Sequence, residues 1–299
     1  MTLQQLKYVV TVAECGNITE AAKQLFVSQP TVTSAIHDLE KEMQIVIFIR
    51  TNKGVILSED GERFLGHARQ VLEQVDLIEG IYKDDVVSKP HFAVSCQHYS
   101  FAVNAFVDVI RKFDAYQYDF TIREEQTHEI IEDVTNLKSE LGVIYLSSKN
   151  TEVLSKMLKR NELEFTELFT ATPHVFICDS HPLASKNSIT MDDLQDYPYL
   201  TYEQGEYNSQ YFSEEFVSTL DSRKNIRVRD RATLFNLIIG LNGYTVCSGV
   251  ISAELNGRNI ISKPLDVEEY MRIGIISRKG VVLSRYAREY IEALKAHCM

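Results

Sequence analysis

The sequence predicts a chain in two parts, a mainly α-helical N-terminal region with a β-hairpin and a larger C-terminal α/β region. Three observations lead to this fold class. Short amphipathic segments with helix-capping residues fill positions 1–58, an apolar heptad pattern follows over 59–89, and strand-like and helix-like segments alternate over 90–299. A length of 299 residues also suggests two or three domains rather than one.

Three short helices are expected before residue 45, because each start carries a suitable capping side chain. Thr2 with Gln5 fits a capping box, and Asn17 caps a second helix. Ser28 caps the third helix, and Pro30 fits its first turn, where a missing N–H costs nothing. Apolar residues recur at helical spacing in each segment, so the three helices should pack together.

The outer face of the third helix carries short hydrogen-bonding side chains near its start. Val32, Ile36 and Leu39 face inward at helical spacing. A helix that reads DNA uses such groups near its N-terminus to contact base edges and phosphates. The candidate DNA-contacting residues here are Ser28, Gln29, Pro30, Thr31, Thr33, Ser34 and His37.

Segment 45–58, "IVIFIRTNKGVILS", predicts a β-hairpin, because apolar runs flank the Asn and Gly of a tight turn. A hairpin beside a helix-turn-helix is a wing, and Arg50 and Lys53 at its tip would face DNA phosphates. Few other cations are present, since residues 1–65 hold six Lys and Arg against eight Asp and Glu. The alternative is a helical bundle for protein contacts, because helix-turn-helix spacing alone is a loose signal.

The helix expected from Ser58 onward carries an apolar seam with heptad spacing. Such a seam needs a partner helix, and the simplest partner is the same helix of a second chain in a C2 dimer. The alternative is packing onto the C-terminal domain of the same chain. The seam residues are Phe64, Ala68, Val71, Val75, Ile78 and Tyr82.

The C-terminal alternation of strands and helices predicts βαβ units and a largely parallel sheet. In such sheets a ligand binds beyond the carboxyl ends of strands. Three loops at such positions, 95–100, 201–209 and 245–249, are rich in hydroxyls and amides, which suits a small polar metabolite, although ordinary loop chemistry would look similar. The candidate residues are Gln97, His98, Ser100, Tyr202, Gln204, Asn208 and Thr245.

Several classes of protein do not fit the composition. Five cysteines without a CxxC pair argue against a disulfide framework and a zinc ribbon, and no metal or cofactor site is expected. The hydrolase, P-loop and metalloprotease motifs are absent, so no catalytic residue is assigned. A net charge of −11 disfavours non-specific coating of nucleic acid. Without a signal peptide or a long apolar run, we expect a cytoplasmic protein that does not enter a membrane.

The N-terminal region resembles the LysR-type transcriptional regulators in "AAKQLFVSQPTVTSAIHDLE" and "IFIRTNKGVILSEDG", and the resemblance extends over the whole chain. It implies a winged helix-turn-helix at 1–58, a dimerising linker helix at 59–89 and an effector-binding domain at 90–299. That domain would resemble a periplasmic binding protein, with subdomain I at about 90–162 and 266–299 and subdomain II at about 163–265. Departures from the family pattern are Gln44 in place of a glycine and Ser34 in place of a basic residue.

The resemblance also implies a function. It suggests a DNA-binding regulator that acts as a homodimer or homotetramer on double-stranded promoter DNA, contacts RNA polymerase, and bends DNA in response to a small-molecule effector. The phrases "SCQHYSFAVNAF" and "DRATLFNLIIGLNGYT" look like the branch that controls cysteine and methionine supply, which makes a sulfur amino-acid precursor a candidate effector. The rival hypotheses are a cytoplasmic solute-binding protein with a helical arm, or an α/β enzyme that uses Cys96 on an amino acid.

Overall fold

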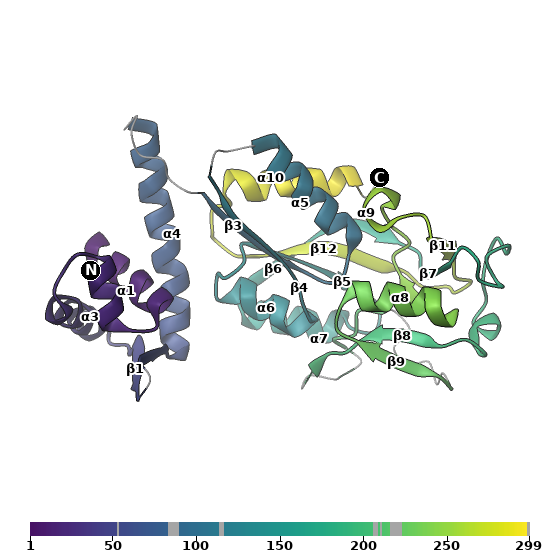
Figure 1. Cartoon of the computed structure of the whole chain (residues 1–299), viewed down its shortest axis with the longest axis horizontal. Helices are drawn as coiled ribbons and strands as arrows, with labels where there is room; N and C mark the ends of the chain where they lie inside the picture. The colour runs from purple at the N-terminus through teal and green to yellow at the C-terminus, as the bar shows by residue number, and fades with distance from the viewer. Residues whose placement is uncertain are drawn as a thin grey trace. The chain divides into compact units, whose positions relative to one another are not determined.

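The computed structural model divides the chain into two compact units, which are described separately below (Figure 1). Unit 1 comprises residues 1–90 with 136–138, and unit 2 comprises residues 91–135 with 139–299. The structure describes residues 1–52, 54–82, 90–113, 117–205, 209, 211–215 and 223–297. None of the helices in these ranges is both long enough and apolar enough to cross a membrane.

Unit 1 contains the predicted helices and hairpin, and local capping explains where its helices begin. The Thr2 hydroxyl accepts a hydrogen bond from the Gln5 amide at 3.2 Å, and the Gln5 side chain accepts one from the Thr2 amide at 2.8 Å. Asn17 accepts bonds from two amides of the next helix. The elements are α1 (Leu3–Cys15), α2 (Ile18–Gln24), α3 (Gln29–Met43), β1 (Phe48–Thr51), β2 (Gly54–Leu57) and α4 (Glu59–Tyr82).

The hairpin β1–β2 is bonded to the helices through two backbone attachments. Oε1 of Glu40, on α3, accepts from the amides of Ile47 at 2.7 Å and Phe48 at 3.1 Å. The amide of Val55 donates to the carbonyl oxygen of Gly16 at 2.9 Å. Because both attachments are short and directed, they hold the wing at a defined position beside α3.

Gly61, in the first turn of α4, leaves no room for a side chain. A Cβ atom there would lie 2.1 Å from the carbonyl oxygen of Ile47, which is backbone and cannot move independently. Gly61→Ala is therefore expected to lower the free energy of unfolding of unit 1 by about 1–3 kcal/mol in urea denaturation. Gln44→Gly should act in the opposite direction, because Gln44 ends α3 with a left-handed φ of 56°. Equal stabilities of the two variants would contradict this account.

Unit 2 is built on a five-stranded sheet in the order β4-β3-β5-β12-β6, and its sheet is mixed rather than largely parallel. Strand β3 is parallel to β4 and β5, but β12 is antiparallel to β5 and β6. The chain leaves this sheet at the end of β6 and returns at the start of β12, and Ala171 pairs with Met271 at that end. A departing and a returning strand at one end must run in opposite directions. The strands are β3 (His91–Cys96), β4 (Asp119–Glu124), β5 (Leu141–Leu146), β6 (Leu163–Ala171) and β12 (Met271–Arg278).

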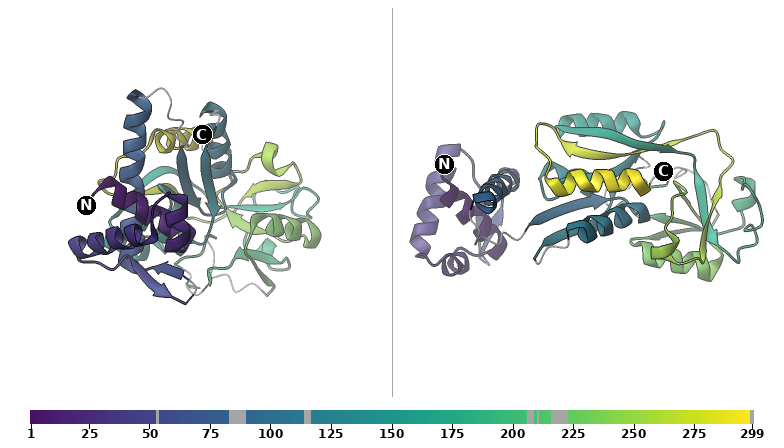
Figure 2. Two further views of the ribbon diagram at one scale, coloured as in Figure 1. Left: turned by 60° about the vertical axis from the view of Figure 1, so that its left-hand side comes forward. Right: turned by 90° about the horizontal axis from the view of Figure 1, so that it is seen from above.

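Helices cover both faces of the five-stranded sheet. Helices α5 (Ser100–Phe113) and α10 (Arg285–His297) lie side by side on one face (Figures 1 and 2), where the Tyr290 hydroxyl donates to the Ala102 carbonyl at 3.0 Å. Helices α6 (Thr127–Thr135) and α7 (Thr151–Arg160) cover the other face with a separate apolar cluster. This fixes β3 and its polar end within the core of the unit.

A second set of strands forms between β6 and β12. Strands β10-β7-β11 make an antiparallel sheet, and β8 pairs in parallel with β9. Since β6 still belongs to the five-stranded sheet, the chain passes to this second sheet after Ala171, later than the expected boundary at residue 162. The elements are β7 (His174–Cys178), η1 (Asp192–Leu194), β8 (Tyr199–Tyr202), β9 (Asn225–Val228), α8 (Arg231–Leu241), β10 (Thr245–Cys247), α9 (Ala253–Asn256) and β11 (Ile260–Pro264).

One expected helix is wrong in the part that the structure describes. The sequence pattern predicts a helix over 208–220, but residues 211–215 form turns and bends. The reason is long-range bonding, because Glu214 and Glu215 receive hydrogen bonds from His98 and Tyr202 instead of facing solvent on a helix. Residues 216–220 lie outside the described ranges.

Candidate functional site

The start of α3 presents a polar surface, as its apolar face packs inward. Val32, Ile36 and Leu39 are buried in the core of unit 1. The Ser28 hydroxyl accepts from the Thr31 amide at 3.3 Å and so caps the helix. Exposed side chains near this end can therefore reach a neighbouring molecule. Of the predicted DNA-contacting residues here, the exposed ones are Ser28, Gln29, Pro30, Thr31, Ser34 and His37, and Thr33 is half-buried.

The wing adds one described cation beside this surface. Arg50 lies in β1 opposite Val55, is exposed, and has no carboxylate within ion-pair distance among the described residues. Lys53, the other predicted wing cation, lies outside the described ranges. An exposed, unpaired guanidinium suits contact with a DNA phosphate, because it loses no internal salt bridge on binding.

The predicted seam on α4 divides between the interior of unit 1 and solvent. Phe64 packs against the core of unit 1 and Ala68 is buried. Further along the helix, Val71 is 41% exposed and Ile78 is 58% exposed, while Val75 is half-buried. The side chain of Tyr82 lies outside the described set. The second half of α4 thus offers exposed apolar residues at heptad spacing to another helix.

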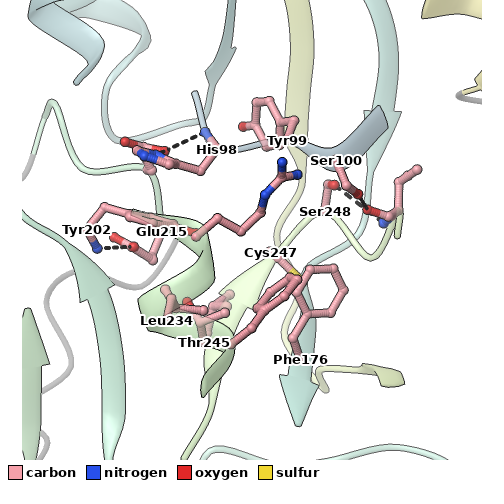
Figure 3. Close-up of a pocket in the computed structure, with 15 residues that line it drawn as sticks. His98, Tyr99, Ser100, Phe176, Tyr202, Glu215, Leu234, Thr245, Cys247 and Ser248 are labelled. Carbon is pink, nitrogen blue, oxygen red and sulfur yellow. Dashed lines mark hydrogen bonds and ion pairs between the residues drawn. The ribbon is translucent and has the colours of Figure 1, made fainter. Parts of the chain in front are cut away.

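Unit 2 contains a narrow cavity of about 40 Å³ where β3 leads into α5 (Figure 3). Four predicted effector residues line it: His98, Ser100, Tyr202 and Thr245. Apolar walls come from β7 and α8, and the cavity has room for only a few water molecules. Asn208, another predicted effector residue, lies outside the described ranges.

Gln97 and Gln204 do not line the cavity but support it from behind. The Gln97 side chain donates to the Thr127 hydroxyl at 2.7 Å and accepts from the Tyr145 amide at 3.0 Å. The Gln204 side chain accepts from the Thr127 amide at 3.2 Å and donates to Glu214 at 3.2 Å. Both are buried, so their amides position the polar groups around the cavity.

His98 forms a buried ion pair with Glu214, a residue that the sequence did not single out. Oε2 of Glu214 lies 2.8 Å from Nδ1 of His98, and Nε2 lies 3.1 Å from the Arg229 carbonyl oxygen. Burial alone would lower the pKa of His98, but the charge and hydrogen bond of Glu214 raise it overall. The imidazole also stacks on the Tyr202 ring at 3.8 Å, so its plane is fixed.

Glu215 is the second acid in this cavity, and its environment favours the neutral form. Its carboxyl accepts from the Tyr202 amide at 2.7 Å, as Figure 3 shows, and lies 2.9 Å from the Ser213 hydroxyl. Burial, followed by the nearby charge of Glu214, raises the pKa of Glu215 to about 8. At neutral pH the pair therefore carries one negative charge, on Glu214.

Two polar groups in the cavity have unused hydrogen-bonding capacity. Thr245 is 4% exposed, and its hydroxyl has no hydrogen-bond partner within the described part of the chain. Arg231, at the start of α8, pairs with Glu124 through Nη2 at 3.0 Å, but its buried Nη1 has no such partner there. Buried donors without partners are costly, which suggests that a ligand or water satisfies them.

Sequence reasoning missed three of the groups that line this cavity. Glu214 and Glu215 were expected on a helix, where adjacent acids are unremarkable. Arg231 follows Asp230, whose side chain accepts from the Thr233 amide and caps α8. That cap predicts the helix start, and helix starts in α/β folds often face ligands. It was the one available signal for Arg231.

A wider, acidic hollow of about 560 Å³ shares His98 with the cavity. Its lining includes His128 and Arg229, but carboxylates predominate. Burial, with the neighbouring Asp133, raises the pKa of Glu125 to about 7. The carboxylates are Glu124, Glu125, Glu129, Glu132 and Glu203. Within the described ranges, no group of three or more His, Cys, Asp or Glu residues is arranged to hold a metal ion.

Comparisons with known proteins agree with this two-unit organisation. A family model described as the bacterial regulatory helix-turn-helix protein, LysR family, matches residues 3–62, and the LysR substrate binding domain matches residues 96–299. The HTH-type transcriptional regulator YvbU of Bacillus subtilis is 27% identical over 300 residues, covering 99% of this chain and 98% of its own. The regulator CysB of Burkholderia cenocepacia is 29% identical over 210 residues, covering 68% of this chain and 63% of its own.

Solved structures share the fold at lower identity. Full-length OxyR from Pseudomonas aeruginosa has a TM-score of 0.64 and 21% identity, covering 99% of this chain and 98% of its own. Full-length CbnR in complex with its target DNA has a TM-score of 0.57 and 18% identity, covering 99% of this chain and all of its own. Since the substrate-binding model alone matches more than half of the sequence, the chain belongs to the LysR family of DNA-binding transcriptional regulators.

Proposed function

We propose that promoter binding and DNA bending by this regulator change when a small polar metabolite occupies the cavity beside His98. The observation that carries the proposal is the pair of unused buried donors, Thr245 Oγ1 and Arg231 Nη1, in a cavity whose other polar groups are bonded. A precursor of the sulfur amino acids is the first ligand to test, given the likeness to CysB. The cavity must open to admit it, because its present volume is about 40 Å³.

On the DNA side, we propose that the start of α3 enters the major groove and that Arg50 contacts the flanking phosphates. Val71 and Ile78 would pair α4 with the same helix of a second chain, and two such dimers would form the tetramer. The complex would act on promoter DNA in the cytoplasm and contact RNA polymerase there. Family membership sets aside the rival hypothesis of a solute-binding protein with no role at DNA.

An enzymatic role for Cys96 has no support in its surroundings. The Cys96 side chain is buried, and burial together with the charge of Glu124 raises the pKa of its thiol well above the ordinary value. A thiol held in this form is a poor nucleophile, because the thiolate is the reactive species. We therefore propose that the cavity binds a ligand without transforming it.

Sensing of peroxide through cysteine is likewise unsupported. Some relatives are named hydrogen peroxide-inducible genes activators, at 22–23% identity. In this chain, burial raises the thiol pKa of Cys15, Cys96 and Cys247, and all four cysteines that the structure describes are unpaired. Oxidation follows thiolate character and exposure, so we propose a bound metabolite as the signal.

The DNA-binding part of the proposal is tested by replacing Arg50. Arg50→Ala should weaken binding to the protein's own promoter region and reduce the slope of log K against log salt by about 0.9 for each subunit on DNA. Fluorescence anisotropy at several salt concentrations measures both quantities.

Arg160→Ala is the matched control, because it removes the same charge from an exposed position on α7 in unit 2. Its salt slope should equal that of the wild type. If Arg50→Ala also kept the wild-type slope, or if the wild type showed no preference for its promoter over random DNA, the proposed DNA contact would be rejected.

A further inference from the structure

Three consecutive polar residues of unit 2 are buried together beside His98. Ser213, Glu214 and Glu215 are 8%, 6% and 2% exposed. Glutamates are almost never fully buried without a partner, and two in succession place two carboxyl groups in one dry space. Segment 211–215, which we call the acidic strap, is attached to α6 by the bond from the Thr127 hydroxyl to the Phe212 carbonyl oxygen at 2.7 Å.

The carboxylate of Glu214 is held by a complete set of donors from other segments. Its Oε2 accepts from the His98 backbone amide at 2.9 Å and lies 2.8 Å from Nδ1 of the imidazole. Its Oε1 accepts from the Gln204 side chain at 3.2 Å. A backbone amide, a charged imidazole and a side-chain amide around one planar anion make a carboxylate receptor. The chain itself supplies the carboxylate that fills it.

The electrostatic surroundings make this occupant replaceable. The charge of Glu214 disfavours ionisation of the adjacent Glu215, so at neutral pH burying the strap requires Glu215 to take up a proton. Nearby, Thr245 Oγ1 and Arg231 Nη1 have no hydrogen-bond partner within the described ranges, although both residues line the same cavity. The strap therefore fills the receptor but leaves other donors of the cavity unused.

We propose that the acidic strap is an internal ligand, and that the effector is a small monocarboxylate that displaces Glu214 from the receptor formed by His98 and Gln204. This rests on the proposed function, since it names the ligand class of the same cavity. One anion replaces another, so the charge of the receptor does not change on exchange. The rest of the ligand would reach Thr245 and Arg231. The glutamates of the neighbouring hollow disfavour further negative charge, which excludes di- and tricarboxylates.

The experiment empties the receptor in the full-length protein and refills it with acetate as the probe. Glu214→Ala removes the internal carboxylate, whereas Glu214→Gln keeps the space filled with a neutral amide. Thermal unfolding is followed in sodium acetate, and in sodium chloride and sodium citrate at matched ionic strength. Because the tethered carboxylate competes at high effective concentration, the apparent dissociation constant for acetate should be about tenfold lower for Glu214→Ala than for the wild type or Glu214→Gln. Citrate should act no differently from chloride.

Equal responses of Glu214→Ala to acetate, citrate and chloride would overturn the proposal. If this variant does not fold in chloride, recovery of its folding in acetate becomes the readout, and failure of acetate to restore it is equally decisive. The second readout is promoter affinity of Glu214→Ala, which should change by about threefold or more between chloride and acetate if the receptor is coupled to DNA. Binding of acetate without that change would mean a merely structural carboxylate site. A chain with no promoter preference would fail the proposed function while leaving the acetate result intact.

Discussion

At pH 9 the Glu215→Gln variant is expected to be more stable than the wild type, whereas the comparison at pH 5 should be far less favourable to it. The pKa of Glu215 is raised to about 8 in the folded state, against 4.5 as its ordinary value. A raised folded-state pKa means that the folded protein binds the proton more tightly than the unfolded chain. Stability from this group is therefore present at low pH and is lost progressively as pH rises from about 4.5 to about 8.

The size of the effect follows from the same two values. A difference of one pKa unit corresponds to about 1.4 kcal/mol, so the loss over this window is on the order of 4 kcal/mol. Glutamine has no proton to lose, and its free energy of unfolding should not share this decline. Urea denaturation at pH 5, 7 and 9 measures the free energy of unfolding of both proteins.

A matched control is Glu164→Gln, because Glu164 is exposed on β6 and makes the same chemical change. Its stability difference from the wild type should stay constant with pH. Glu214→Gln supplies a second check, since removing the charge of Glu214 should lower the pKa of Glu215 and move the window to lower pH. A wild-type minus Glu215→Gln difference that does not change between pH 5 and pH 9 would contradict the assigned environment of Glu215.

Helix starts could be predicted from the sequence because a cap depends on neighbours only a few residues apart. Thr2, Asn17 and Ser28 each accept the expected amide hydrogen bonds. Sheet direction could not be predicted in the same way. The antiparallel direction of β12 depends on where the chain leaves β6, a hundred residues earlier, and the local alternation of strands and helices contains no information about it.

The candidate effector site was predicted in part for a related reason. Loop positions after strands identified His98, Ser100, Tyr202 and Thr245, which do line the cavity. Glu214 was missed because its role depends on His98, which is 116 positions away in the sequence. Its own neighbourhood, "SEEF", fits a solvent-facing helix equally well. Long-range partners decided its position, and local pattern analysis does not include them.

Promoter affinity is expected to fall by about two orders of magnitude in Ser34→Glu, with the fold of unit 1 unchanged. Ser34 is exposed on α3, one helical turn from Thr31 and from His37, on the polar face that we propose faces DNA. A carboxylate there would meet phosphates or base-edge acceptors, and such a change costs about 1–3 kcal/mol for each subunit on DNA. Two subunits of a dimer contribute separately, so their costs add.

Ser34→Gln has nearly the shape of the glutamate variant without its charge, so its affinity should lie much closer to that of the wild type. Ser34→Arg introduces the basic residue that many family members have at this position, and it should raise affinity and steepen the salt slope by about 0.9 per subunit. Anisotropy titrations of one promoter fragment at several salt concentrations rank the three variants, and thermal unfolding checks the fold. Because only charge separates Ser34→Glu from Ser34→Gln, equal affinities for these two would mean that this face of α3 does not approach DNA, and the assignment of α3 as the recognition helix would fail with it.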